Sequence, residues 1–320
     1  MRLRTARSAA EMDQFRELWD DLHQRSESAT FFQSFGWNRL AATLFSERES
    51  PYVVAAESDS GRALIPAAVS RAGLTLLGES MSDYRDVLSI GDPAALGAAW
   101  VKLAELGLPL VVTALRGDRV RDRWRALKPE PFVHAPQVRG VEIAADEFAS
   151  RHSRLGRTLR ILSREGISLH HYCGDAGGVV RWIYQQKAQQ QDLAGNLFAD
   201  STRVDFMLAF CKLAGSDCDI FTFERGEPIA ALVTFRDRQM RRFYTIYFDP
   251  AWGRLSPGTC LTYEITRRSL AEGLDCDYMT GEQPHKSRFM TSMAPLFKVN
   301  ARAELLAVVG KAEPSLQRAA

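Results

Sequence analysis

The stretch "YFDPAWGRLSPGTCLTYEITRRSLAEG" at residues 247–273 constrains the fold of this chain most strongly. An aromatic run that is typical of a strand stops at Asp249 and Pro250, and a helix begins directly after Pro257 and Gly258. The first turn of a helix has free N–H groups and carries the positive end of the helix dipole. The sequence therefore predicts a buried strand that leads to an anion-attracting helix start. The alternative is a plain strand-to-helix connection, in which Pro and Gly only end the strand and begin the helix.

Length and composition indicate a globular protein of about two domains. The chain has 320 residues, of which 46% are hydrophobic and 25% charged, so it can bury a sizeable core. Its net charge is only +2, which makes DNA binding unattractive and requires any basic site to be local. The longest apolar run, near residues 108–115, is far shorter than the roughly 20 residues of a membrane helix. The start of the chain lacks the apolar stretch of a signal peptide, so we expect a cytoplasmic protein without a transmembrane segment.

The first half of the chain mixes helices with strands that are adjacent in sequence. Helices are predicted over 10–24 and 94–106, a hairpin around "DSGR" at 59–62, and further strands over 74–78 and 108–115. The stretch 29–37 is predicted to be a strand end that runs into a helix. Three prolines in "KPEPFVHAPQ" mark a change in composition, and we expect the domain boundary near residue 150. The predicted domains are therefore 1–150 and 151–320.

The second half of the chain also mixes helices with strands that are adjacent in sequence. Its predicted helices are 149–165, 176–191, 201–214 and 258–272, and its predicted strands are 167–172, 219–225, 228–236, 241–249, 275–280, 296–302 and 304–309. Short turns such as "RGE" join several of these strands and favour antiparallel hairpins. We therefore predict an α/β (α+β) fold with two tandem lobes. Each lobe has a mixed, largely antiparallel sheet that is flanked by helices.

Four segments of the chain carry a family resemblance. The order of the strand "RFYTIYFD", the helix after it and the strand "DCDYMTG" resembles the second part of the GNAT N-acyltransferase fold. "TFFQSFGW", "MSDYRD", the Trp-x-x-x-Ser-Pro-Gly loop and "GEQPHK" resemble the GNAT-like family that includes the CelD proteins of cellulose and exopolysaccharide biosynthesis. The same two-lobed architecture occurs in the Fem family, whose members transfer amino acids from aminoacyl-tRNA to cell-wall precursors.

The resemblance implies an N-acyltransferase that moves an acyl group from acyl-CoA, such as acetyl-CoA, to an amino sugar or glycan precursor. Residues 1–150 would form a degenerate GNAT-like lobe with acceptor contacts, and residues 151–320 would bind the acyl donor. The acceptor would be a small-molecule or lipid-linked sugar of exopolysaccharide or cell-envelope synthesis. Two alternatives stay open, namely a Fem-like transferase that uses aminoacyl-tRNA and a non-catalytic scaffold of a polysaccharide-synthesis complex.

The loop at the helix start holds the predicted donor-binding residues, which are Arg254, Ser256, Gly258 and Thr259. In the GNAT fold the pyrophosphate of coenzyme A sits at this helix, and Gly258 would allow close approach of the backbone. The loop departs from the usual Arg/Gln-x-x-Gly-x-Gly/Ala pattern. Pro257 has no N–H to donate, which leaves acyl-CoA and aminoacyl-tRNA both open as donors.

Candidate catalytic residues follow from the chemistry of acyl transfer. The carboxylate of Glu282, just after a predicted strand, could take the proton of an amine, and Asp83 is a second candidate base. In this fold class a tyrosine often protonates the departing thiolate, which points to Tyr244 or Tyr247, of which Tyr247 is predicted. Because the two tyrosines are three residues apart, they are expected on opposite faces of the strand. For Glu282 and Asp83 the alternatives are a polar surface turn and a capped turn.

Further residues are predicted to contact the substrate: Tyr84, Asp86, Trp252, His285, Lys286 and Arg157. Lys286 could hold an anionic group of the acceptor, and Trp252 could close over a substrate or simply fill a gap. Arg157 belongs to an arginine stripe at spacings of three and four on a predicted helix, with Arg151, Arg154, Arg160 and Arg164. Such a stripe could bind a nucleotide sugar, a lipid-linked sugar phosphate or RNA, or it could be a solvated helix face.

Metal binding is not predicted. The five cysteines are scattered and include no Cys-x-x-Cys pair. His170 and His171 stand near Cys173, but neighbouring side chains on a strand point to opposite faces, so the two histidines could not reach one ion. Ordinary strand residues are the preferred interpretation of "HHYC".

Overall fold

The computed structural model describes residues 1–117, 123–174, 176–189 and 196–312. They divide into two compact units, the first built from Met1–Val133 with a return of the chain at 295–312, and the second from His134–Ala294. The chain leaves the first unit inside strand β7 (Glu130–Val138) and re-enters it inside strand β13 (Ser292–Ala301). The first division therefore lies between Val133 and His134, before residue 150 and inside the proline-rich stretch 128–137.

The first unit contains a sheet whose strands are mostly antiparallel. Its order is β1-β2-β3-β4-β6-β13, with β5 also paired to β3, and only the β4–β6 pairing within this order is parallel. The strands that precede β7 are β1 (Arg2–Ala6), β2 (Ser50–Glu57), β3 (Gly61–Ser70), β4 (Gly73–Leu76), β5 (Leu88–Gly91) and β6 (Leu110–Arg116). The α-helices are α1 (Ala9–Met12), α2 (Arg16–Arg25), α3 (Phe35–Leu44), α4 (Ala94–Ala104) and α12 (Ala303–Ala312).

Both faces of this first sheet are covered, which explains why its strands have continuous apolar runs. Along β2, Val54 packs into one core cluster with Trp100 of α4, whereas Val53 packs into another with Trp19 of α2. One prediction of local structure was wrong in part here and another in full. The strand end predicted within 29–37 is a 3₁₀ turn, because Thr30 and Gln33 make a reciprocal capping box, whereas the helix predicted to follow it is α3. The predicted strand 304–309 lies in α12.

The second unit contains the other strands, in the order β7-β12-β11-β10-β9-β8. Only β11 and β12 run parallel among the pairs assigned in this unit. These strands are β8 (Ser168–Cys173), β9 (Cys218–Arg225), β10 (Glu227–Asp237), β11 (Met240–Phe248) and β12 (Asp275–Asp277). The α-helices are α6 (Ala145–Arg151), α7 (Ser153–Arg164), α8 (Gly177–Ala188), α9 (Ser201–Ala214), α10 (Pro257–Ala271) and α11 (Pro284–Ser287).

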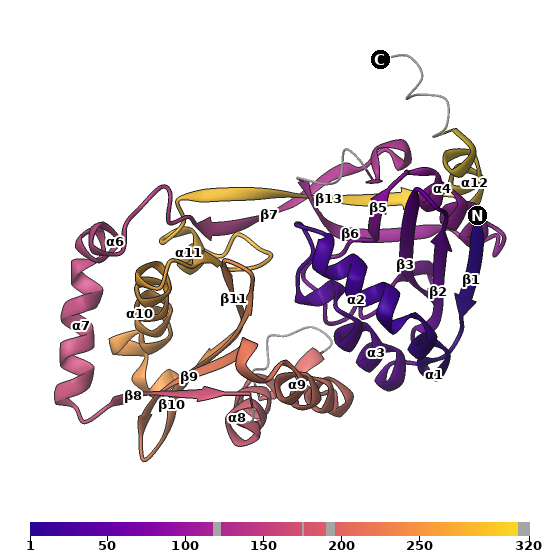
Figure 1. The fold of residues 1–320 in the computed structure, drawn as a ribbon. Helices are drawn as coiled ribbons and strands as arrows, with labels where there is room; N and C mark the ends of the chain where they lie inside the picture. Colours follow the sequence, from indigo (N-terminus) through magenta and orange to yellow (C-terminus); the bar gives the residue numbers. More distant parts are fainter. Residues whose placement is uncertain (118–122, 175, 190–195, 313–320) are drawn as a thin grey trace. The chain divides into compact units, whose positions relative to one another are not determined.

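Helices cover the second sheet on both faces (Figure 1). Leu232 of β10 belongs to the core cluster that includes Leu261 of α10. Phe235, three residues further along β10, instead packs against Phe210 of α9 with ring centroids 5.1 Å apart. The predicted fold class, α/β units with mixed, largely antiparallel sheets flanked by helices, is confirmed. No helix in the described part of the chain is long and apolar enough to cross a bilayer.

Candidate active site in the second unit

The site begins where β11 separates from β12. The two strands pair in parallel over three positions only, which end at Arg242 opposite Asp277. At that end the buried Arg242 guanidinium donates to Asp277 from Nη1 over 2.5 Å, and it also binds Asp237. Beyond this ion pair β11 runs on to Phe248, while the chain after Asp277 turns to β7, where the Tyr278 amide donates to the Pro136 carbonyl. One edge of the second half of β11 is therefore left without β12 beside it.

A bulge in β11 changes which side chains face this opening. Val233 of β10 pairs with Thr245, but the next residue, Thr234, pairs with Phe243, so Tyr244 is the extra residue of the bulge. Tyr244 packs against Phe235, which contacts Phe210 of α9. Tyr247 packs against Trp182 of α8, so both rings face the side of the sheet that α8 and α9 cover. The prediction that they point to opposite faces was wrong, because it assumed an unbroken alternation along the strand.

The cavity, which we call the β11 cavity, has a volume of about 460 Å³. Its wall comes from β11, from the first turns of α10, from α8 and from the segment around α11. The lining residues are Lys187, Leu232, Phe243, Tyr244, Thr245, Ile246, Tyr247, Phe248, Pro250, Gly258, Thr259, Thr262, Tyr278, Gln283, Lys286 and Phe289. Of the predicted site residues, the structure thus brings Tyr247, Gly258, Thr259 and Lys286 together.

The start of α10 packs tightly against the end of β11. Ser256 adopts a left-handed conformation, with φ 45°, and Pro257 then opens the helix, as the sequence predicts. A Cβ atom on Gly258 would lie 2.8 Å from Cδ1 of Phe248, so only glycine fits here without a shift of that ring. First-turn amides of a helix have no intrahelical acceptor. Gly258 and Thr259 both line the β11 cavity, so their amides are candidate donors for an anion bound there.

Arg254 and Ser256 lie on a second cavity of about 380 Å³, which we call the basic cavity. Its lining residues are Arg151, His152, Arg154, Leu155, Thr158, Arg254, Leu255, Ser256 and Arg288. Burial, followed by the charges of Arg288 and Arg151, lowers the pKa of His152. The four predicted donor-binding residues thus divide between two cavities that both adjoin the start of α10.

The arginine stripe is not one continuous helix face. The predicted helix 149–165 is interrupted at His152, so Arg151 ends α6 while the other arginines belong to α7. Arg154 lines the basic cavity, whereas Arg157 is exposed and lines neither of the two cavities. Trp252 is half-buried against the core, with the Arg225 guanidinium 5.9 Å from its ring centroid, and it lines neither cavity. These contacts account for Trp252 as a packing residue.

Two lysines supply the charge of the β11 cavity. Burial, with a further contribution from the charge of Lys286, lowers the pKa of Lys187 to about 8. Its Nζ donates to Oγ1 of Thr245 over 3.1 Å, and Nζ of Lys286 donates to the Thr280 carbonyl over 2.7 Å. Sequence reasoning missed Lys187, because a single lysine on an amphipathic helix gives no signal of what it faces.

Two tyrosines of the cavity have a raised pKa. Burial raises the pKa of Tyr247, and the Asp249 carboxylate adds to this effect. The Tyr247 ring packs edge-on against Trp182, with centroids 5.3 Å apart. Burial also raises the pKa of Tyr278 well above its ordinary value, and its hydroxyl group shares a hydrogen bond of 2.8 Å with Oγ1 of Thr266. Tyr278 is therefore committed to the core, whereas Tyr247 can serve as a proton donor.

Glu282 lies next to the cavity along the chain, one residue before the lining residue Gln283. Its side chain is 51% exposed, and its Oε1 lies 2.7 Å from Nδ1 of His134. It is thus a partly solvated carboxylate that is paired with a histidine, and not a wall residue of the β11 cavity. The side chain of His285 lies outside the described part of the structure.

Asp83, Tyr84 and Asp86 belong to the first unit, where their neighbours are structural. Tyr84 is buried, and its carbonyl accepts a hydrogen bond from Gln33. Asp86 accepts from the Arg123 guanidinium and from Nε1 of Trp124, each over 2.8 Å. Asp83 is half-buried and acts electrostatically on the neighbouring Arg85. Their role in binding or catalysis stays a prediction.

Comparison with known proteins places this site in a recognised fold. A family model described as an acetyltransferase (GNAT) domain matches residues 149–287. No curated protein matches the sequence. Among solved structures, FemX has a TM-score of 0.62 at 9% identity, with 92% of this chain and 98% of that chain covered.

Two further structures resemble the chain over nearly its whole length. One is the C-terminal domain of a protein described as a lysylphosphatidylglycerol synthetase from Agrobacterium fabrum, with a TM-score of 0.59, 12% identity and 94% of each chain covered. The other is L-PGS from Bacillus licheniformis, with a TM-score of 0.58, 8% identity, and 92% of this chain and 95% of that chain covered. Such identities establish the fold alone. The chain thus contains a GNAT acetyltransferase-like domain, and its two-unit fold is that of FemX and of the lysylphosphatidylglycerol synthetase domain.

Proposed function

We propose that the protein is an N-acyltransferase that takes an acyl group from acyl-CoA and transfers it to an amine whose molecule also carries a negative charge. The observation that carries the proposal is the β11 cavity, which lies beside the half of β11 that has left β12 and ends at the open first turn of α10. A strand edge offers N–H and C=O groups to an extended donor, and a helix start attracts its diphosphate.

The donor would lie along β11. Its diphosphate would bind the amides of Gly258 and Thr259, and the arginines of the basic cavity would hold further phosphate. Pro257 has no N–H, so the start of α10 offers one amide donor fewer than a standard acyl-CoA loop. The arginines of the basic cavity, which Arg254 and Ser256 of the same loop line, would compensate with charge.

The acceptor would be held by charge and deprotonated at the cavity's edge. Lys187 and Lys286 would bind its anionic group, as an amino-sugar phosphate or a glycan precursor provides. The amine nitrogen attacks the thioester carbonyl, and the carbon–sulfur bond breaks. Glu282 takes the amine proton directly or through water, and Tyr247 donates its proton to the departing thiolate. CelD-like glycan synthesis, with an amino sugar as acceptor, is the pathway that the resemblance favours.

An aminoacyl-tRNA-dependent transferase is the second candidate. The whole-chain likeness to FemX favours it, as does the arginine-rich surface of α6 and α7, because the Fem family uses aminoacyl-tRNA. A scaffold without catalytic activity is the third candidate, and the degenerate loop is the feature that favours it.

Label transfer distinguishes the three candidates. The purified protein is incubated with amino-sugar phosphates and with either labelled acetyl-CoA or labelled aminoacyl-tRNA. We expect label to move from acetyl-CoA, and we expect Glu282→Gln to lower turnover about 100-fold while donor affinity is kept. Transfer from aminoacyl-tRNA alone would replace the proposal with the second candidate. Binding of neither donor in a calorimetric titration would favour the scaffold.

A further inference from the structure

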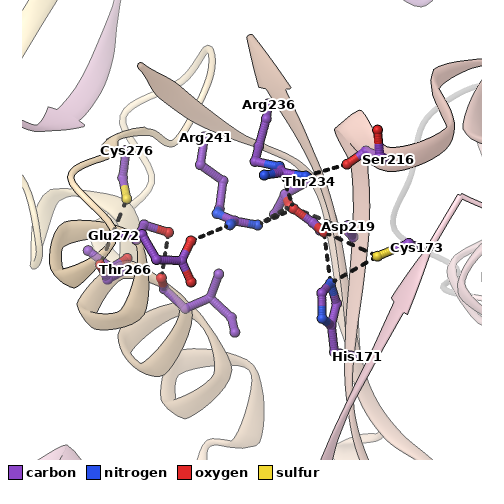
Figure 2. A network of polar contacts seen from close by, with 12 residues as sticks. His171, Cys173, Ser216, Asp219, Thr234, Arg236, Arg241, Thr266, Glu272 and Cys276 are labelled. Atoms are coloured by element: carbon purple, nitrogen blue, oxygen red, sulfur yellow. Dashed lines mark hydrogen bonds and ion pairs between the residues drawn. The ribbon is translucent and has the colours of Figure 1, made fainter. Parts of the chain in front are cut away.

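A cluster of metal-ligating side chains lies at the edge of the second sheet, among residues that the proposed transfer reaction does not use. His171 and Cys173 alternate along the edge strand β8 and therefore point to the same face. Asp219 of β9 stands directly opposite Cys173 in the register of the two strands. Figure 2 shows the three side chains converging on one point.

Two of the three distances among these ligand atoms are close to those of a zinc site. The Cys173 sulfur lies 3.7 Å from Nε2 of His171 and 3.8 Å from Oδ1 of Asp219. Bonds of about 2.3 Å to sulfur and about 2.0–2.2 Å to nitrogen and oxygen place neighbouring ligands of a tetrahedral zinc ion about 3.3–3.6 Å apart. Nε2 of His171 and Oδ1 of Asp219 are 2.7 Å apart, so this pair would have to open by about 0.6 Å.

Two of the three ligands are already held in place. The ring of His171 stacks on Phe221, with centroids 4.6 Å apart and planes 15° from parallel. The Asp219 carboxylate is buried, and its Oδ2 is bound by Arg241 over 2.6 Å and by Arg236 over 3.0 Å. These bonds leave Oδ1 turned towards His171 and Cys173, which is how a supporting partner orients a ligating carboxylate.

Exposure also suits a zinc ion. Asp219 and Glu272 balance the guanidinium groups of Arg236 and Arg241, with Arg241 shared between the two carboxylates. A zinc ion bound with the Cys173 thiolate therefore leaves a net positive charge, which solvent can screen at this exposed edge. Cys173 is exposed and the His171 side chain is 45% exposed, so solvent can fill the fourth position. The sequence argument against metal binding considered His170 with His171 and overlooked the pair that shares a face.

We propose that His171, Cys173 and Asp219 bind one zinc ion, with water as the fourth ligand. A sulfur ligand beside an imidazole selects zinc over calcium and magnesium. Binding converts the Cys173 thiol to a thiolate and releases its proton to solvent.

Equilibrium dialysis of the untagged full chain against Zn²⁺ tests the proposal, with Co²⁺ as a spectroscopic probe of a metal–thiolate bond. We expect one ion per chain and, for His171→Ala and Cys173→Ser, affinity lowered at least about tenfold. His170→Ala is the matched control, because His170 points to the other face and contacts Ser168. It should bind zinc like the wild type.

The cobalt–thiolate absorption should appear with the wild type and with His170→Ala, and it should be lost in Cys173→Ser. Thermal melts with and without Zn²⁺ check that each variant is folded, and zinc should raise the melting temperature of the wild type more than that of Cys173→Ser. The proposal is overturned if the folded wild type binds no stoichiometric zinc, or if His170→Ala weakens binding as much as His171→Ala.

Discussion

Burial at the β11 cavity lowers the pKa of Lys187 to about 8. Its ammonium group is partly buried, near a second lysine, and its hydrogen bond is to the neutral hydroxyl group of Thr245. A lysine in this setting gains from any anion that enters the cavity. This is why we assign the negatively charged part of the acceptor to Lys187 and Lys286, and the reacting amine to the side near Tyr247 and Glu282.

Acceptor binding should therefore depend on pH. With a pKa of about 8, Lys187 is charged below pH 8 and neutral above it, so KM for an anionic acceptor should rise as pH increases through about 8. Lys187→Met should raise KM about tenfold at pH 7, with little change in kcat, and should remove this pH dependence. Initial rates measure both quantities. Lys212→Met, on the exposed surface of α9, is the control, and an unchanged KM in Lys187→Met would refute the assignment.

At the scale of elements, the separation of β11 from β12 creates the cavity, and the ion pair of Arg242 and Asp277 marks where it starts. Sequence patterns located strands β8 to β11 well, because apolar alternation and short turns are local signals. They could not locate the bulge at Tyr244 or the short length of β12. Both depend on which strand lies alongside, and this is information that no single segment carries.

The ion pair should also matter for stability. Asp277 is fully buried and binds Arg242 and Gln137, so Asp277→Asn leaves a buried guanidinium with Asp237 as its remaining carboxylate. We expect a loss of about 3 kcal/mol in the free energy of unfolding, the lower end for breaking a buried pair. Asp275→Asn on the same strand should cost less than about 1 kcal/mol, because its partner Arg139 is 42% exposed and solvent screens the pair. Urea unfolding compares the two, and equal losses would contradict this account.

At the scale of the whole molecule, the sequence predicted two α/β units and the GNAT-like character of the second. It missed that the chain returns to the first unit. It also missed β7, because "KPEPFVHAPQ" has the prolines of a linker and yet forms a strand. It also grouped Arg254 and Ser256 with Gly258 and Thr259, although they line different cavities. Adjacent residues at a turn face different directions, and only coordinates separate them.

The central claim is that the β11 cavity, closed at one end by the start of α10, holds an acyl-CoA. Calorimetric titration of acetyl-CoA into the wild type, Gly258→Ala and Gly253→Ala tests it most directly. A Cβ on Gly258 meets Phe248 at the wall of the cavity, whereas a Cβ on Gly253 meets nothing within 4 Å.

We predict saturable binding to the wild type and to Gly253→Ala, with affinity for Gly258→Ala about tenfold weaker, as expected when an added methyl group displaces a ring. A wild type that binds no acetyl-CoA, or a folded Gly258→Ala variant that binds as tightly as the wild type, would contradict the claim.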